Sequence, residues 1–341
     1  MNDDKRRVHV SLLAFSEVMV STLMGLYDVL HSLPLLASYD GALPVTARLK
    51  VEIVGLKAGS MSTASGIPLE AHKSIEEVEN SDVIIIPSVM LEHGEWRQGR
   101  YPQLLEWLLR LHGRGAQLCS TCSGVLLLAE TALLDGKDAT IHWIYAPTFR
   151  RNFPKVRLRL DRALIVTGER NGFVMSGAST SWHDLVLYVI AQHIGPTAAQ
   201  GVAKFFAFQR HADGLASYVV FEPATDHGDA TIRSAQEWLS GHFSVANPIE
   251  QTVKRSGIPE RTFKRRFKHA TGLAPIEYVQ RLRVEDAKRR LERTAAPIDE
   301  IGWNVGYEDP AFFRRLFKRM TGITAGVYRR KFQVPAPPIQ S

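Results

Sequence analysis

Cys122 is the residue of this chain whose type and position most directly suggest chemistry. It follows an apolar stretch at 116–120 that predicts a strand, and it precedes a helical pattern at 124–134. A thiol on such a turn lies at a helix N-terminus, where the helix dipole favours the thiolate. Gly124 allows the helix to pack close to the turn, as in a nucleophile elbow. The alternative is a buried cysteine that acts as a small apolar residue.

A second cysteine, Cys119, stands three residues before Cys122, at the spacing of thioredoxin-like redox pairs. Cys119 falls inside the predicted strand, so its side chain is not expected beside a cysteine on the following turn. A redox sensor based on Cys122 stays open as an interpretation. Two cysteines are too few ligands for a structural zinc site. We therefore expect neither a metal nor a cofactor.

The elements that must position Cys122 alternate between strands and helices. Apolar runs and helical spacing predict strands at 8–15, 49–55, 83–87, 116–120, 156–160, 163–167 and 173–175, and helices at 22–33, 101–112, 124–134, 143–152 and 182–193. Repeated strand–helix units predict an α/β domain with a mostly parallel sheet and helices on both faces. Such a sheet places its sites at the carboxyl ends of strands, where Cys122 lies.

This region resembles the PfpI/class I glutamine-amidotransferase-like superfamily. The resemblance rests on the elbow Cys122-Ser123-Gly124, on Glu17 after the first strand, and on the segment LDGKDATIHW at 134–143. It implies that Glu17 and His142 approach the thiol of Cys122. It also implies a homodimer, because domains of this kind commonly pair.

The chain departs from the active members of that superfamily in three places. Ser123 stands where protease-like members have the histidine of their Cys-His dyad, and Pro87-Ser88-Val89 replaces a Gly-rich oxyanion loop. The late His-x-Glu of amidotransferases is missing, and Trp182-His183-Asp184 is the nearest match. A nucleophile without a base or oxyanion donors is a poor catalyst. We therefore expect a sensor and not an enzyme; a Cys-dependent hydrolase or amidase with an accessory domain is the alternative.

The family resemblance implies that the sensor's ligand is a small molecule, an amino acid or an amine. A carboxylate beside aromatic rings suits such a cation through cation–π contact, and Trp96 and Trp182 join the aromatic residues of this region. These tryptophans have an alternative interpretation as core or interface residues. The predicted ligand-binding residues are Glu17, Cys122, Ser123, His142 and Trp143.

Charge separates the last third of the chain from the rest. Residues 231–341 hold 21 Lys and Arg against 11 Asp and Glu, whereas the first 230 residues hold 21 against 24. A strongly basic module predicts a polyanionic partner, although a solvated basic face is an alternative. The whole chain has two cysteines and no apolar run near the ~20 residues that span a bilayer. We therefore expect a cytoplasmic protein without membrane contact.

The basic third contains an internal repeat. At a shift of 50, Phe263 and Phe267 pair with Phe313 and Phe317, and the alignment continues through Thr271-Gly272 against Thr321-Gly322. Each copy reads as a short helix, a turn near Gly257 or Gly306, and a second, basic helix. This pattern is typical of a helix-turn-helix unit. Two copies predict an all-α domain that binds double-stranded DNA.

Residues 249–332 resemble an AraC-type DNA-binding domain, with Ala325 at a position where that family usually has proline. A helix predicted at 274–291 would span roughly 27 Å, comparable with the ~34 Å of one DNA turn. It can therefore present two recognition helices to successive major grooves. The predicted DNA-binding residues are Arg261, Lys264, Arg265, Phe312 and Arg315 in the grooves, with Arg314 and Lys318 on phosphates.

Together these patterns predict a sensor domain at 8–212, a linker at 213–230 and a DNA-binding domain at 231–332. A PfpI-like domain before an AraC-type domain resembles the GlxA group of transcriptional regulators. That resemblance implies a sequence-specific regulator, an activator acting with RNA polymerase, that responds to a small metabolite.

Overall fold

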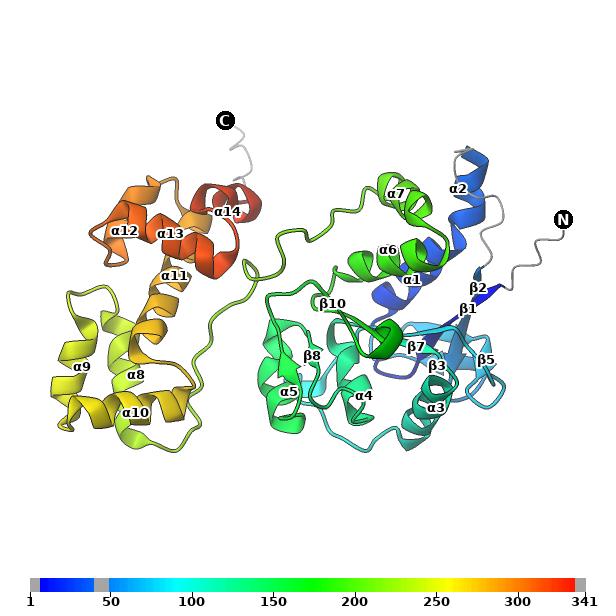
Figure 1. The fold of residues 1–341 in the computed structure, drawn as a ribbon, viewed down its shortest axis with the longest axis horizontal. Coiled ribbons are helices and arrows are strands. Elements are labelled where there is room, and N and C mark those ends of the chain that lie inside the picture. The colour runs from blue at the N-terminus through cyan, green and yellow to red at the C-terminus, as the bar shows by residue number, and fades with distance from the viewer. Residues whose placement is uncertain (1–6, 40–48, 335–341) are drawn as a thin grey trace. The chain divides into compact units, whose positions relative to one another are not determined.

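The computed structural model describes residues 7–39 and 49–334, which form two compact units, Met1–Leu215 and Ala216–Ser341 (Figure 1). The division between the units falls inside the segment 213–230 that the sequence predicts as a linker. The N-terminal unit is α/β and the C-terminal unit is helical, in agreement with the predicted fold classes.

The N-terminal unit is built on a seven-stranded sheet with the order β10-β11-β7-β6-β1-β2-β5. Neighbouring strands are parallel except β10 against β11. The central strands are buried on both faces, which explains their continuous apolar runs. The strands are β1 (Val8–Ala14), β2 (Leu49–Gly55), β5 (Lys73–Ser74), β6 (Val83–Ile86), β7 (Gln117–Thr121), β10 (Leu164–Thr167) and β11 (Phe173–Ser176).

Helices cover both faces of this sheet (Figure 1). The helices α1 (Val20–His31) and α6 (Trp182–His193) pack on one face, with α2 (Leu33–Tyr39) and α7 (Pro196–Phe205) packed beside them. On the other face lie α3 (Pro102–Gly113) and α4 (Val125–Glu130). The smaller elements are the hairpin β3 (Gly59–Ser62) and β4 (Pro68–Ala71), the pair β8 (Asp138–Ala139) and β9 (Arg157–Leu158), and α5 (Ala146–Asn152).

Two local differences from the predicted elements have physical reasons. The helix predicted at 124–134 ends at Glu130, because Ala132 takes a left-handed backbone conformation with φ of +58°. The helix α7 and the β3–β4 hairpin have no counterpart among the predicted elements. Both are short, and the buried residues of α7 are two alanines and a valine, which give a weak apolar signal in the sequence.

The C-terminal unit contains the predicted repeat of helices. Its helices are α8 (Ala230–His242), α9 (Pro248–Ser256), α10 (Glu260–Thr271), α11 (Pro275–Arg293), α12 (Ile298–Asn304), α13 (Pro310–Thr321) and α14 (Ala325–Phe332). Gly257 and Gly306 form the predicted turns, with φ of +67° and +97°. One cluster of buried residues surrounds Phe263 and Phe267, and a second surrounds Phe313 and Phe317. The long helix α11 contributes to both clusters.

The segment 216–229, which lies within the predicted linker, packs against the C-terminal unit. We call it the strap. The ring of Tyr218 lies 5.1 Å from that of Phe332, and the ring of Phe221 lies 5.4 Å from that of Tyr278. The strap therefore contacts both helix-turn-helix clusters and is an ordered part of this unit.

Among residues 7–39 and 49–334, no single helix is long and apolar enough to cross a membrane. The helices α1 and α2 pass that test only when they are taken together, and the chain bends by 45° between them.

Candidate ligand site and DNA interface

Cys122 lies on the sharp turn that the sequence predicts. It directly follows β7, and its φ of +50° is a strained backbone conformation of the kind found at nucleophile elbows. Gly124 lies so close to the end of β6 that an added Cβ would be 2.4 Å from the carbonyl oxygen of Pro87. Only glycine fits this approach. The turn stands beside the point where the strand order reverses, because β1 has β2 on one side and β6 on the other.

The loops around the elbow close over it. The hydroxyl of Ser123 donates to the Val89 carbonyl at 2.6 Å and accepts from the Val89 N–H at 2.8 Å. The loop after β1 is bound to the same segment, since the N–H of Met19 donates to Ser88 and that of Met90 to Glu17. Cys122 is only 2% exposed. The N–H of Val89 is thus already bonded and cannot serve as an oxyanion donor.

Burial raises the pKa of the Cys122 thiol, and hydrogen bonds from Ser179 and Ser123 only partly oppose this. The prediction that the helix dipole favours a thiolate here is therefore wrong, because burial favours the neutral thiol. Burial also raises the pKa of Cys119. A protonated, buried thiol is a poor nucleophile and a poor redox sensor. Neither the hydrolase nor the redox interpretation is supported by this site.

The two groups predicted to approach the thiol have other partners. His142 accepts a hydrogen bond from the N–H of Ile144 at 3.3 Å, and burial lowers its pKa, which leaves it neutral at pH 7. Its ring lies 5.5 Å from that of Trp143. Glu17 is paired with Arg100. Within the described residues, no hydrogen bond or ion pair joins either group to Cys122, whereas the hydroxyl of Ser179 lies 3.8 Å from its sulfur.

Glu17 and Arg100 form part of a cation-binding arrangement that we call the Arg100 cage. The guanidinium of Arg100 lies 4.8 Å from the ring centre of Trp96 and 5.4 Å from that of Tyr101. It is paired with Oε1 of Glu17, while the buried Oε2 of Glu17 has no hydrogen-bond partner in the described part of the chain. Arg100 is not among the predicted site residues, although its position beside Trp96 and Tyr101 in the segment WRQGRY is a detectable signal.

Trp96 and Trp182, two of the tryptophans considered as pocket residues, have different roles. Trp96 is buried and donates from Nε1 to Glu130 at 2.6 Å, which fixes one wall of the Arg100 cage. Trp182 packs against Gly25 of α1, where an added Cβ would lie 2.7 Å from its ring. Trp182 therefore joins α1 to α6 and serves the core.

In the first helix-turn-helix unit, α10 separates packing residues from exposed bases. Phe263 and Phe267 are fully buried, while Arg261, Lys264 and Arg265 are exposed. Lys264 is paired with Glu260, and no acid within the described residues pairs with Arg265. The remaining arginine, Arg266, turns inward and binds both carboxylate oxygens of Asp229, at 2.7 and 2.9 Å. Arg266 lies three positions after the buried Phe263, and residues at this spacing share one face of a helix. This spacing is the signal in the sequence for its position.

The second unit repeats this arrangement on α13. Phe313 and Phe317 are buried, while Phe312 is 39% exposed beside the exposed bases Arg315 and Lys318. Arg314 binds both oxygens of Asp299, and Arg315 has only a distant contact of 3.9 Å with Asp309. Arg315 and Lys318 are therefore less engaged by acids than Arg314.

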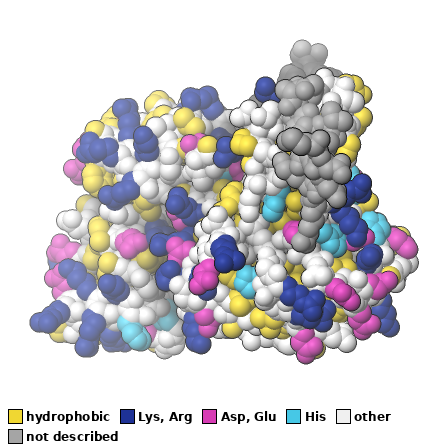
Figure 2. All heavy atoms as spheres, turned by 45° about the vertical axis from the view of Figure 1, so that its right-hand side comes forward, with side chains coloured by type: hydrophobic (Ala, Val, Ile, Leu, Met, Phe, Trp, Pro, Cys, Tyr) yellow, Lys and Arg dark blue, Asp and Glu magenta, His cyan; other side chains and the backbone are white. Residues whose placement is uncertain are grey.

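Overall charge alone does not locate the DNA interface. Figure 2 shows Lys and Arg side chains spread across the visible face, interspersed with Asp and Glu. The two basic helices differ from that background because each follows a glycine turn and has a fully buried aromatic face. Position, not the number of charges, distinguishes α10 and α13, the two helices that the sequence predicts to enter the DNA grooves.

Arg283 of α11 joins the two helix-turn-helix units within the C-terminal domain. It donates to the carbonyl oxygens of Phe243 at 2.7 Å and Val245 at 3.3 Å in the first unit, and of Gly306 at 2.8 Å in the second. The 19-residue helix α11 is about 28 Å long. This rigid connector, with Arg283 joining the loop between α8 and α9 to the turn at Gly306, fixes how the two helix-turn-helix units are spaced.

Comparisons with known proteins agree with this geometry. The model of the DJ-1/PfpI family matches residues 8–169, and a helix-turn-helix domain model matches residues 252–331. The chain is 27% identical over 237 residues to the HTH-type transcriptional regulator GlxA of Rhizobium meliloti, covering 66% of this chain and 68% of the relative. It is 23% identical to the HTH-type transcriptional regulator CdhR of Pseudomonas aeruginosa, covering 84% and 83%.

The chain is an AraC-type transcriptional regulator with an N-terminal DJ-1/PfpI domain. This AraC-type regulator binds DNA through its C-terminal domain, and its N-terminal domain is sensory. Its curated relatives are regulators and not enzymes, which agrees with the closed elbow at Cys122. A solved structure from Vibrio parahaemolyticus, at 18% identity and a TM-score of 0.51, shares the fold; it covers 59% of this chain and 99% of its own.

Proposed function

We propose that the N-terminal domain of this regulator binds a small cationic metabolite, an amino acid or an amine, and thereby changes transcription. The observation that carries the proposal is the Arg100 cage. A guanidinium already sits between the Glu17 carboxylate and two aromatic rings, so the cage has the charge and the ring geometry that an organic cation requires. The Oε2 of Glu17, which accepts no hydrogen bond from the residues that the structure describes, offers a further acceptor.

In this proposal the metabolite takes the place of the Arg100 guanidinium. The pair is partly solvated, since Glu17 is 20% and Arg100 33% exposed, so exchanging one cation for another costs little. The backbone of Glu17 is bonded to Met90, next to the Val89–Ser123 link, so a change at Glu17 reaches the elbow. Cys122, Ser123, His142 and Trp143 remain the proposed surroundings of the ligand. A ligand of this kind acts by favouring one of two arrangements of the protein.

Replacing Glu17 by Gln is expected to weaken the binding of a cationic effector at least tenfold, because the carboxylate is lost while the shape is kept. Arginine, choline and other small amines are titrated into the full-length protein, and binding is followed by calorimetry and by the rise in melting temperature. Glu92→Gln is the matched control, since Glu92 is exposed and outside the cage. Equal affinity of the wild type and Glu17→Gln for the tightest-binding amine would refute the cage as its site.

We propose that Arg265 and Arg315 read bases, whereas Lys318 binds phosphate. Replacing either arginine by Ala should cost about 1–3 kcal/mol of DNA-binding free energy and relax the preference at one base position. Replacing Lys318 by Ala should weaken all sequences equally and flatten the salt dependence. Sites selected from a random DNA library, and single-base variants of them, supply the measurement by fluorescence anisotropy. Uniform losses for all three variants would contradict these assignments.

We also propose that the regulator works as a homodimer, as an activator that acts with RNA polymerase in the cytoplasm. A dimer brings two DNA-binding domains to neighbouring half-sites, which increases affinity without new contacts. Sedimentation velocity of the full-length protein at micromolar concentration should give twice the chain mass of 38.1 kDa. A monomer under all conditions, including with DNA bound, would remove this part of the proposal.

A further inference from the structure

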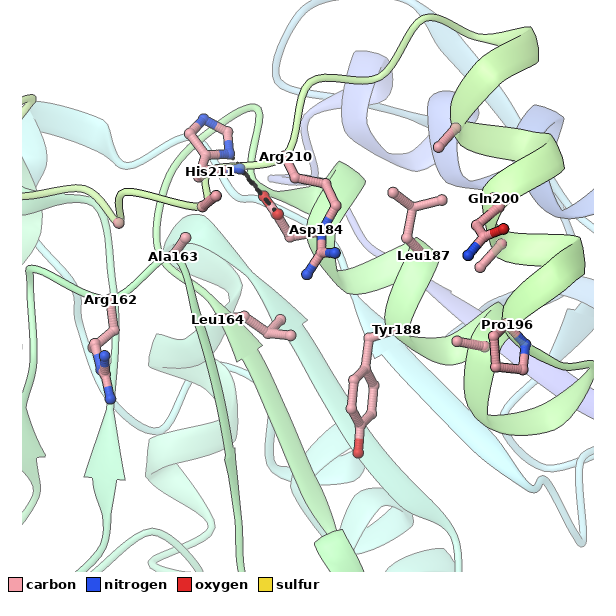
Figure 3. Close-up of a pocket in the computed structure, with 15 residues that line it drawn as sticks. Arg162, Ala163, Leu164, Asp184, Leu187, Tyr188, Pro196, Gln200, Arg210 and His211 are labelled. Atoms are coloured by element: carbon pink, nitrogen blue, oxygen red, sulfur yellow. Dashed lines mark hydrogen bonds and ion pairs between the residues drawn. The ribbon is translucent and has the colours of Figure 1, made fainter. Parts of the chain in front are cut away.

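A second cavity in the N-terminal domain has no part in the elbow or in the Arg100 cage. It measures about 470 Å³ and lies between the edge strand β10, the helices α6 and α7, and the last segment of the domain, 210–214 (Figure 3). Small-molecule sites typically have volumes of about 300–1,000 Å³. The cavity is therefore large enough for a compact metabolite.

The wall of this cavity is mostly apolar. Aliphatic side chains from all three elements form a continuous surface that suits a hydrocarbon or aromatic body: Leu164, Leu187, Ala191, Ala199 and Ala203. Polar groups that can fix the orientation of a bound molecule also line the cavity: Arg162, Asp184, Tyr188, Gln200, Arg210 and His211.

The one acid in the wall, Asp184, is already engaged. Its Oδ2 lies 2.7 Å from Nδ1 of His211, and its Oδ1 accepts from the His211 N–H at 3.2 Å. Both carboxylate oxygens thus hold the segment 210–214 against α6. Asp184 is 9% exposed, so little of its charge is available to a ligand.

The guanidinium of Arg210, which also lines this wall, lacks such a partner among the described residues. No hydrogen bond or ion pair within residues 7–39 and 49–334 involves its guanidinium. Figure 3 shows Arg210 extending from the segment 210–214 into the space between Leu164 and Leu187, whereas Arg162 points away from that space. An Arg guanidinium offers five donors in a planar fork that matches a carboxylate.

We propose that this cavity binds a small carboxylate with an apolar body, held by Arg210. The carboxylate pairs with the guanidinium of Arg210, and the apolar body packs on the aliphatic wall between α6 and α7. The site differs in charge from the Arg100 cage, which selects cations. A bound carboxylate would also tie the segment 210–214 to α6 and α7, directly before the chain continues into the strap.

Benzoate is the probe that tests the proposal. Benzamide is its control, because it has a similar shape but no negative charge. Calorimetric titration into the full-length protein should show binding of benzoate and at least tenfold weaker binding of benzamide. Arg210→Gln should reduce benzoate affinity at least tenfold, while Arg162→Gln, the matched control, should change it less than threefold. Ala203→Leu, which narrows the cavity, should also abolish binding. Glu17→Gln should leave benzoate affinity unchanged, so that this site and the Arg100 cage are judged separately.

Three outcomes would overturn the proposal. The first is an absence of benzoate binding at millimolar concentration in the wild type. The second is equal affinity for benzoate and benzamide, which would make the contact purely apolar. The third is an equal loss in Arg210→Gln and Arg162→Gln, which would indicate a diffuse effect of charge.

Discussion

Replacing Lys288 by Met is expected to lower the free energy of unfolding of the DNA-binding domain by about 3–5 kcal/mol. Lys288 is 4% exposed on α11, and its Nζ donates to the carbonyl oxygen of Val219 in the strap at 2.6 Å and to Glu285 at 2.9 Å. It also lies 5.9 Å from the ring centre of Tyr328. Without the ammonium, Glu285 keeps a nearly buried charge with no counterion, and the strap loses its bond to α11.

Hydrogen exchange of peptides from 275–293, in the full-length protein, measures this loss of stability. Lys331→Met is the control, because Lys331 is exposed and its contact with the ring of Tyr218 is a surface one, so the change should stay within about 0.5 kcal/mol. Adding Glu285→Gln to Lys288→Met should recover part of the stability, since no unpaired charge remains. A loss below about 1 kcal/mol in Lys288→Met would show that the strap is not held by this residue.

Replacing Gly124 by Ala is expected to cost the sensor domain about 3 kcal/mol. The new Cβ would lie 2.4 Å from the carbonyl oxygen of Pro87 and 2.6 Å from that of Ile86. Both neighbours are backbone atoms at the end of a central strand, so relief requires a shift of β6 or of the elbow. Because backbone atoms must move, the expected loss of stability is near the upper end of the usual cost of overpacking.

The two cysteines of the chain provide a readout confined to this domain, because both are buried there. Labelling by a thiol reagent across a urea titration should move to lower urea in Gly124→Ala. Gly113→Ala is the matched control, since an added Cβ at Gly113 meets no atom within 4 Å. That variant should be neutral or slightly stabilised. Identical labelling midpoints for the wild type and Gly124→Ala would contradict the close approach at the elbow.

The fold of the C-terminal domain was predictable because its determinants are local and occur twice. The spacing of Phe263 and Phe267, repeated at Phe313 and Phe317, marks the buried face of each recognition helix. Gly257 and Gly306 mark turns that require positive φ. Arg266 is the exception on α10, since its inward pairing with Asp229 joins residues 37 positions apart.

In the N-terminal domain, the elbow likewise combines features that depend on neighbouring residues with one that depends on distant residues. The strand, the turn at Cys122 and the need for glycine at 124 follow from neighbouring residues and were predicted. The protonation of the thiol was predicted wrongly, because it depends on burial by the loops after β1 and β6. The helix dipole acts locally and can be expected from sequence, whereas desolvation is a property of the packed domain.

The sequence by itself therefore determined the classes of the two domains, their order along the chain and the positions of the two repeated helix pairs, because periodicity and turn residues act over a few positions. Tertiary structure alone decided which charges are free and which are engaged. It paired Arg100 with Glu17 and Lys288 with the strap, and it left Arg210 in a cavity without a partner among the residues that the structure describes. Partners of this kind lie tens of residues apart, and nothing in the local pattern of a sequence specifies which of them will meet.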